Sequence, residues 1–262
     1  MKKQSTYGFK EWTVHSVNCC SGCSNNCRYC YAKGMAARFK RITPEEWPLE
    51  WVRQKDVDKP QKLYPSRVMF PSSHDITPGN FDACFTVLEK LLKRRNEILI
   101  VSKPRFECIK WICDSFIGYR YKILFRFSIT AMNDELLSFW EPGAPCYAER
   151  KASLAYAVFT GFETSVSIEP MLDSDNIVQL VEDLVPYVTD AIWIGKMNHI
   201  KRNIQIDCLE IEDAVRRIEE GQTDDRIKEI FDVLKDNPKI KWKSGIKKIA
   251  GIKPPEVPGL DI

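Results

Sequence analysis

Residues 12–31 read WTVHSVNCCSGCSNNCRYCY, and this stretch decides how we interpret the rest of the chain. Cys23, Cys27 and Cys30 follow the spacing C-x3-C-x2-C, with Tyr29 immediately before the third cysteine. Thiolates this close together can surround one face of an iron–sulfur cube, because each intervening loop is very short. Cubes that only carry electrons usually have four cysteine ligands. A set of three leaves one iron open for another ligand, much as an open position marks a catalytic zinc site.

The segment Cys23-Ser-Asn-Asn-Cys27-Arg-Tyr29-Cys30 resembles the signature C-x3-C-x-aromatic-C of the radical S-adenosylmethionine (SAM) enzymes. The resemblance implies that Cys23, Cys27 and Cys30 hold a [4Fe-4S] cluster, and that Tyr29 belongs to the SAM site. It also implies that SAM binds the open iron and is cleaved by one electron to a 5′-deoxyadenosyl radical, which abstracts a hydrogen atom from a substrate. The electron would come from an external donor of the flavodoxin or ferredoxin type.

A structural zinc site is the main alternative for the same cysteines. Zinc prefers a closed tetrahedral site, and Cys19, Cys20 or His15 could supply the fourth ligand. The protein would then be a zinc-binding scaffold without catalysis. A disulfide framework fits poorly in a chain of 262 residues that shows no secretion signal.

Composition sets further bounds. The net charge is +3, from 39 basic and 36 acidic residues, so global charge does not indicate nucleic-acid binding and only a local patch could. The N-terminal residues Met-Lys-Lys-Gln-Ser-Thr lack an apolar signal region, and no run of about 18 apolar residues occurs. We therefore expect a soluble, cytoplasmic protein without membrane contact, whose cysteines outside the motif are reduced and mostly buried.

Six short apolar runs, separated by segments of helical period, predict alternating strands and helices. Such alternation is typical of a parallel sheet in an α/β fold. It favours a partial (β/α)6 TIM-like barrel, which the resemblance also implies. We expect residues 1–200 to form the barrel, and residues 201–262 to form an extension of helices and a β-hairpin packed on the same domain. The predicted strands are 13–17, 67–70, 97–103, 121–128, 165–169 and 191–195.

The strand ends carry the remaining site candidates, because function in α/β barrels lies at the C-terminal ends of the strands. Lys103 closes an apolar strand and suits the SAM carboxylate as a point charge. Ser128 suits the ribose or the carboxylate, and Ser72 or Ser73 could offer oxygen atoms to the amino group. Serines at such places are also common cap and turn residues.

Glu169 lies at the end of the fifth predicted strand. Its carboxylate could face the cavity and contact the cofactor. A salt bridge to Arg126 is the structural alternative.

Within the superfamily, the chain resembles spore photoproduct lyase and the related phage Gp37/Gp68-type proteins over roughly residues 12–198. In the lyase, SAM contacts fall on a serine of the strand-two loop, the lysine after strand three and a serine on strand four. The resemblance therefore implies these roles for Ser72 or Ser73, Lys103 and Ser128. The segments that carry it are Ser72-Ser-His-Asp-Ile76, Ser102-Lys103-Pro104-Arg105, Arg126-Phe-Ser128 and Ser167-Ile-Glu169-Pro170.

The chain departs from the lyase at one position. The lyase returns a hydrogen atom from a cysteine of the strand-two loop, whereas residues 67–78 contain no cysteine. Either another cysteine takes this role, with Cys146 the nearest candidate, or the reaction differs. The substrate could be a nucleic acid, as in lyase-like DNA repair, or a peptide or small metabolite.

The C-terminal segment Lys239–Ile249 alternates apolar and basic residues around Ser244-Gly245, which predicts a β-hairpin. Its lysines could contact phosphates while Trp242 stacks beside a base. A solvated edge strand protected by lysines would have the same pattern. The candidate nucleic-acid residues are Lys241, Trp242, Lys243, Lys247 and Lys248.

Overall fold

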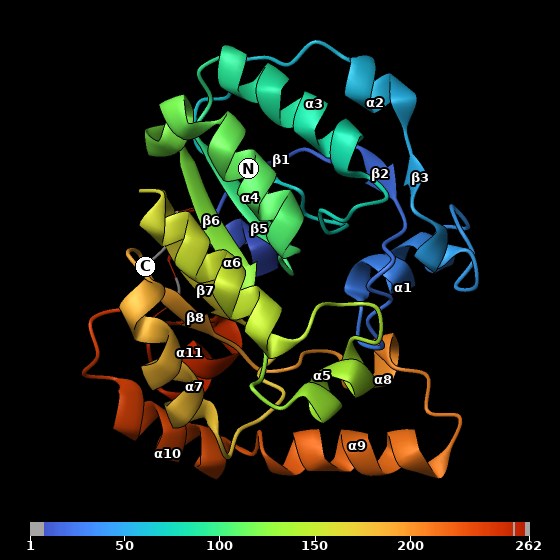
Figure 1. The fold of residues 1–262 in the computed structure, drawn as a ribbon. Coiled ribbons are helices and arrows are strands. Elements are labelled where there is room, and N and C mark those ends of the chain that lie inside the picture. The colour runs from blue at the N-terminus through green and yellow to red at the C-terminus, as the bar shows by residue number, and fades with distance from the viewer. Residues whose placement is uncertain (1–7, 254, 260–262) are drawn as a thin grey trace.

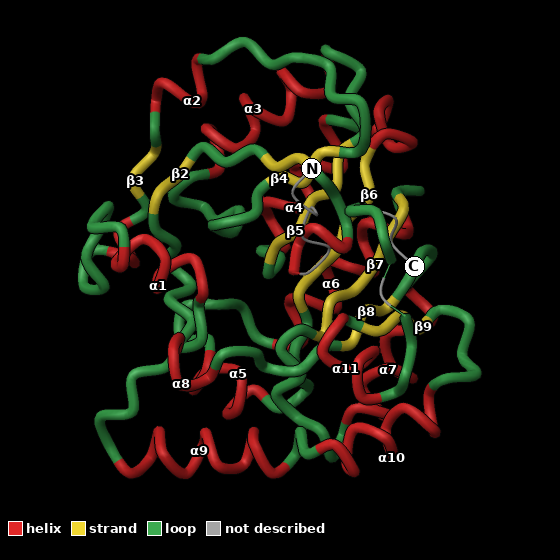
Figure 2. The backbone as a smooth tube through the Cα atoms, turned by 180° about the vertical axis from the view of Figure 1, so that it is seen from behind, coloured by secondary structure: helices red, strands yellow, loops and turns green. Residues whose placement is uncertain are grey.

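The computed structural model describes residues 8–253 and 255–259 and is built on a seven-stranded, all-parallel sheet (Figures 1 and 2). The N-terminal residues considered above for a signal region lie outside the described residues. The sheet is open, with β1 and β9 as its edges. In spatial order, the strands are β1 (His15–Ser16), β4 (Val68–Phe70), β5 (Ile98–Ser102), β6 (Ile123–Ser128), β7 (Glu163–Ile168), β8 (Ile192–Ile194) and β9 (Ile240–Trp242).

Helices connect the strands and cover one face of the sheet, as α3, α4, α6 and α7 do in Figure 1. Among the described residues, no helix has the length and apolar character needed to cross a membrane. The helices are α1 (Tyr31–Arg38), α2 (Gln54–Asp58), α3 (Phe81–Lys93), α4 (Phe106–Ser115), α5 (Asp134–Trp140), α6 (Tyr147–Phe159), α7 (Ile177–Leu184), α8 (Ile200–Asn203), α9 (Leu209–Glu220), α10 (Asp224–Leu234) and α11 (Ser244–Ile249).

Short elements complete the chain. A small antiparallel pair, β2 (Cys20–Ser21) with β3 (Trp51–Val52), flanks the cysteine motif and was not predicted. The 3-10 helices are η1 (Gly8–Glu11), η2 (Trp47–Leu49), η3 (Ile117–Lys122) and η4 (Val185–Tyr187).

Apolar packing covers both faces of the sheet. On the helix side, residues such as Ile100, Phe125 and Phe127 belong to the main core with the apolar faces of the helices. On the inner side, Leu99 and Leu124 pack in a second cluster with Trp12, Met69, Ala191 and Trp193. Burial on both faces explains why β4, β5 and β8 are nearly continuous apolar runs in the sequence.

The segment before β1 is tied to the residue that follows β9. Lys243 Nζ lies 3.1 Å from Glu11 Oε1 and donates to the carbonyl oxygen of Gly8 at 2.8 Å. The same ammonium group lies 4.1 Å from the centre of a Trp12 ring. Because Glu11 precedes one edge strand and Lys243 follows the other, these contacts link the two ends of the open sheet.

The α/β fold class and its parallel strands are confirmed, and the six predicted strands correspond to β1 and β4–β8. The predicted β-hairpin at 239–249 is wrong. β9 pairs in parallel with β8, and Ser244 begins helix α11 rather than a turn. Period-two alternation fits a half-buried parallel strand as well as a hairpin strand, so the pattern did not distinguish them.

The structure contradicts the predicted nucleic-acid element at three of its residues, which are buried. Trp242 is 6 % exposed and packs beside Phe231, so its ring cannot stack on a base. Lys243 and Lys247 are 1 % and 4 % exposed. Lys241 lies on β9 with its Nζ atom 5.6 Å from the centre of the Trp193 ring, and Lys248 lies on α11.

Trp242→Ala should destabilise the protein by about 3–5 kcal/mol, because it removes a large buried side chain from the core. The matched control is Trp111→Ala, since Trp111 is 61 % exposed and such surface changes usually stay within about 0.5 kcal/mol. Urea unfolding followed by circular dichroism measures both. Equal stability of the two variants would contradict the position of Trp242 in the core.

Candidate active site

A cavity of about 700 Å³ opens at the C-terminal ends of the strands, within the range of ligand sites in proteins. Nine of the predicted site residues line it, although they come from the cysteine loop and four different strand ends. They are Cys23, Cys27, Tyr29, Cys30, Ser72, Ser73, Lys103, Ser128 and Glu169.

The cysteine motif forms a compact loop between β2 and α1. Cys23 and Cys27 are buried, and Cys30 is the N-cap of α1, where its sulfur accepts from the amide of Lys33 at 3.4 Å. Burial raises the pKa of all three thiols, that of Cys27 to about 12, because the thiolate loses its hydration. A bound metal ion would stabilise the three cysteines as thiolates, because it takes the place of the thiol protons.

Gly143 lets a second loop approach the cysteine loop closely. A Cβ atom at this position would lie 2.0 Å from the carbonyl oxygen of Ser24. The amide of Gly143 donates to the carbonyl oxygen of Asn25 at 3.1 Å. The segment after α5 therefore supports the motif from outside.

Glu141 is the centre of a buried polar network behind the cysteines, and the sequence analysis missed it. Its carboxylate accepts hydrogen bonds from Tyr29 Oη and, at 2.9 Å, from Thr130 Oγ1. Arg150 pairs with it at 2.6 Å, and both side chains are fully buried. Burial alone would raise the pKa of Glu141, but Lys103 and Arg150 outweigh it and hold the pKa below its usual value.

Lys103 lies between two carboxylates at the cavity wall. Its Nζ atom is 4.0 Å from Asp75 Oδ2 and 4.0 Å from Glu141 Oε1, and 5.7 Å from the centre of the Tyr29 ring. Burial would lower the pKa of Lys103, but Cys27, Tyr29 and the two carboxylates together raise it well above its usual value. Lys103 is therefore a fixed positive charge next to the cysteine loop.

The strand-two loop is held by Asn18, another residue that the sequence analysis did not identify. Asn18 Oδ1 accepts from the amides of Ser72 at 2.7 Å and Ser73 at 2.9 Å, while its Nδ2 donates to Ser72 Oγ at 2.9 Å. Tyr31 Oη donates to the carbonyl oxygen of Ser72 at 2.6 Å. These contacts present the two serines to the cavity.

Glu169 lies on the cavity wall at the end of β7. It pairs with Lys243 at 3.4 Å, while Arg126 pairs with Asp190 at 3.0 Å, so the alternative bridge from Glu169 to Arg126 is not formed. Burial raises the pKa of Glu169 although Lys243 opposes the shift.

The cavity lining also includes the basic residues Lys196, His199 and Arg202. Lys196 directly follows the sixth predicted strand, where function was expected, whereas His199 and Arg202 were not predicted. All three follow β8, in or beside the short helix α8. Their signal in the sequence was their position after the sixth predicted strand.

Cys146 is not among the cavity-lining residues. Its side chain is exposed at the start of α6. A hydrogen-atom donor must reach the substrate, so the role predicted for Cys146 does not agree with its position.

No protein-family model and no curated protein sequence matches the chain. Solved structures do match its fold. SuiB of Streptococcus suis bound to S-adenosylmethionine has a TM-score of 0.55 at 11 % identity, covering 94 % of this chain and 54 % of SuiB. SuiB bound to the precursor peptide SuiA has a TM-score of 0.54 at 12 % identity, with the same coverage.

A spore photoproduct lyase mutant with dinucleoside spore photoproduct has a TM-score of 0.53 at 14 % identity, covering 86 % of this chain and 74 % of the lyase. The chain thus spans about half of SuiB and three quarters of the lyase. These similarities establish the fold alone, an open α/β barrel shared with SuiB and spore photoproduct lyase, and at that level they agree with the predicted resemblance.

Glu141→Gln should lower the free energy of unfolding by about 3–5 kcal/mol near neutral pH, because it removes the charge that balances buried Arg150 and Lys103. The ionised carboxylate contributes to the free energy of unfolding at pH values above about 4.3, which is its pKa in the unfolded chain. This contribution is lost as the pH falls through the lower pKa that the group has in the folded protein. The difference in the free energy of unfolding between wild type and variant should therefore become smaller at acidic pH. Urea unfolding at several pH values measures this difference.

Asp114→Asn is the control, because it removes an exposed carboxylate that pairs with Lys110 and should hardly change stability. A Glu141→Gln variant as stable as this control would contradict the network.

Proposed function

We propose that the protein is a radical SAM enzyme. In this proposal Cys23, Cys27 and Cys30 hold a [4Fe-4S] cluster, and Lys103 and Ser128 contact SAM in the adjoining cavity. The single observation that carries it is the meeting of these five residues on one cavity wall. When bound, the cluster and SAM would supply an electron and a 5′-deoxyadenosyl radical for hydrogen abstraction.

The donor set fits a cluster with one open iron. The described residues that line the cavity include three cysteines, namely Cys23, Cys27 and Cys30, and no fourth cysteine is among them. A single zinc ion would need its ligand atoms close together. The three motif sulfurs do not form such a group: within the described chain, the group of ligand atoms that lie within 4.8 Å of one another contains none of them. This weighs against the alternative of a zinc scaffold at the motif.

Residues of the chain would orient SAM through charge and hydrogen bonds. Lys103 is buried and positively charged, which suits a carboxylate. Tyr29 is fixed by Glu141 through its hydroxyl, so its ring forms a rigid part of the wall. Ser128 and one of Ser72 and Ser73 would take the ribose and amino groups, and Glu169 would contact the cofactor from the opposite side.

The substrate that we favour is anionic and nucleic-acid-like, because Lys196, His199 and Arg202 line the cavity. The reaction would be lyase-like. A peptide substrate is the second candidate, since the fold similarity to SuiB bound to its precursor peptide covers 94 % of the chain. We further propose a flavodoxin or ferredoxin as electron donor and a cytoplasmic location.

The proposal is tested by anaerobic purification with iron and sulfide analysis. We expect about four irons per chain and reductive cleavage of SAM to 5′-deoxyadenosine. Cys27→Ala should abolish the visible absorption of the cluster, whereas Cys113→Ala, at a buried cysteine of α4, should keep it. If Cys19→Ala or Cys20→Ala removed the cluster as completely as Cys27→Ala, the ligand assignment would be wrong.

Lys103→Met should weaken SAM binding while the iron content stays unchanged. The lost charge-assisted contact is typically worth about 1.5–3 kcal/mol, or roughly tenfold to a hundredfold in affinity. Equilibrium dialysis with labelled SAM measures the change. Wild-type affinity in an iron-replete variant would exclude Lys103 from the SAM site.

A further inference from the structure

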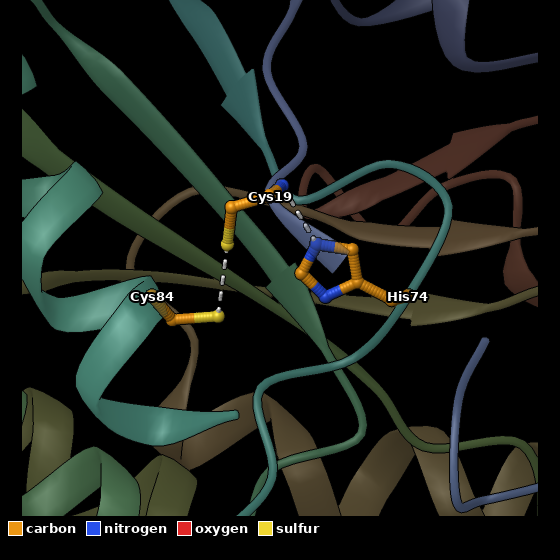
Figure 3. A group of neighbouring side chains, drawn as sticks. All are labelled: Cys19, His74 and Cys84. Carbon is orange, nitrogen blue, oxygen red and sulfur yellow. Dashed lines mark hydrogen bonds between the residues drawn. The ribbon is translucent and has the colours of Figure 1, made fainter. Parts of the chain in front are cut away.

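A second group of potential metal ligands lies outside the cysteine motif (Figure 3). Cys19 precedes β2, His74 belongs to the loop after β4, and Cys84 lies on α3. Their ligand atoms all lie within 4.8 Å of one another. The three side chains thus converge from separate parts of the chain, and the proposed radical chemistry does not use this convergence.

The two sulfur atoms have the spacing of ligands to one ion. Cys19 Sγ and Cys84 Sγ are 3.7 Å apart. Two thiolates about 2.3 Å from a zinc ion, at the tetrahedral angle, lie about 3.8 Å apart. Two sulfur atoms in van der Waals contact without a metal ion would lie equally far apart. The histidine therefore supplies the evidence that distinguishes a metal site from a simple contact.

His74 is oriented as metal-binding histidines usually are. Its Nδ1 lies 3.0 Å from the carbonyl oxygen of Asp75, which can only accept, so Nδ1 carries the proton. Nε2 is therefore unprotonated, and its electron pair, on the side of Cys19, accepts a hydrogen bond from the amide of Cys19 at 3.3 Å (Figure 3). A backbone carbonyl that fixes the tautomer in this way is the usual partner of a zinc-bound histidine. A metal ion at Nε2 would take the place of the hydrogen bond from the Cys19 amide.

Burial and charge agree with a divalent ion. Cys19 and Cys84 are 0 % exposed and His74 is 6 % exposed. Zn²⁺ with two thiolates and a neutral imidazole carries no net charge, so the group can lie in an apolar core without an unbalanced ion. Asn80 Oδ1 accepts from Cys84 Sγ at 3.2 Å and from the amide of Thr77 at 3.1 Å, and it would be a candidate for the fourth position once Cys84 has lost its proton.

We propose that Cys19, His74 and Cys84 bind one Zn²⁺ ion that is separate from the iron–sulfur cluster. The ion would tie the residues before the cysteine loop to helix α3 and to the strand-two loop. Because His74 also lines the cavity, the zinc site would stiffen the wall of the active site. The site does not depend on the proposed function, since it uses none of the motif cysteines.

The test is metal analysis of the full chain, purified anaerobically with its cluster. We expect about one zinc per chain in addition to iron. Cys84→Ser should lose zinc and keep iron, Cys27→Ala should lose iron and keep zinc, and Cys113→Ser should keep both. If the purified full chain contained zinc but neither held iron nor cleaved SAM, the proposed function would be refuted, whereas the zinc site would still be supported.

X-ray absorption at the zinc edge of the wild-type protein provides a measurement that does not depend on the folding of a variant. Two sulfur ligands and at least one nitrogen ligand are expected. Cobalt binding to a variant with Cys23, Cys27 and Cys30 all replaced by alanine should produce thiolate-to-cobalt absorption, which Cys84→Ser added to that variant should remove. Wild-type protein without zinc, cobalt spectra that Cys84→Ser leaves unchanged, or a Cys19–Cys84 disulfide in the isolated protein would each overturn the proposal.

Discussion

The buried carboxylate of Glu141 is the interaction on which the site depends. It pairs with Arg150 where both side chains are fully buried, and it accepts from Tyr29 and Thr130. With Lys103 and Asp75 nearby, two cations balance two anions, so each buried charge has a partner of opposite sign. Through these contacts, the end of α5 and the start of α6 determine where the tyrosine of the cysteine motif lies.

A second buried set of charges surrounds Lys243, which pairs with one of the cavity-lining residues, Glu169. Lys243 lies between Glu11 and Glu169, and thereby joins the segment before β1, the end of β7 and the residue after β9. An open sheet has two edges with unpaired backbone groups, and contacts between its ends restrain them. The cost of burying Lys243 is offset because two carboxylates and a backbone carbonyl surround the ammonium group.

The two groups of cysteines differ in surroundings. Cys23, Cys27 and Cys30 line a cavity that ligands can enter, whereas Cys19 and Cys84 lie inside the main apolar core. An open cavity suits a cofactor that must exchange SAM and substrate. A closed, buried set suits a structural ion. The proposed cluster and the proposed zinc site therefore have distinct roles, although Cys19 and Cys23 are close in sequence.

The sequence by itself determined the alternation of strands and helices, because burial on both faces makes strands such as β4, β5 and β8 apolar runs, and helices such as α3 show a 3.6-residue period. It also determined the cysteine spacing and the strand-end position of Lys103, Ser128 and Glu169, which are local properties of the chain. Only the tertiary structure decided which distant residues meet. Glu141 and Arg150 carry no local signal, since a buried ion pair is defined by its partners and not by its neighbours in sequence. The same holds for the segment after residue 239: alternating lysines suggested an exposed surface, but Glu11, more than 200 residues earlier, allows Lys243 to be buried.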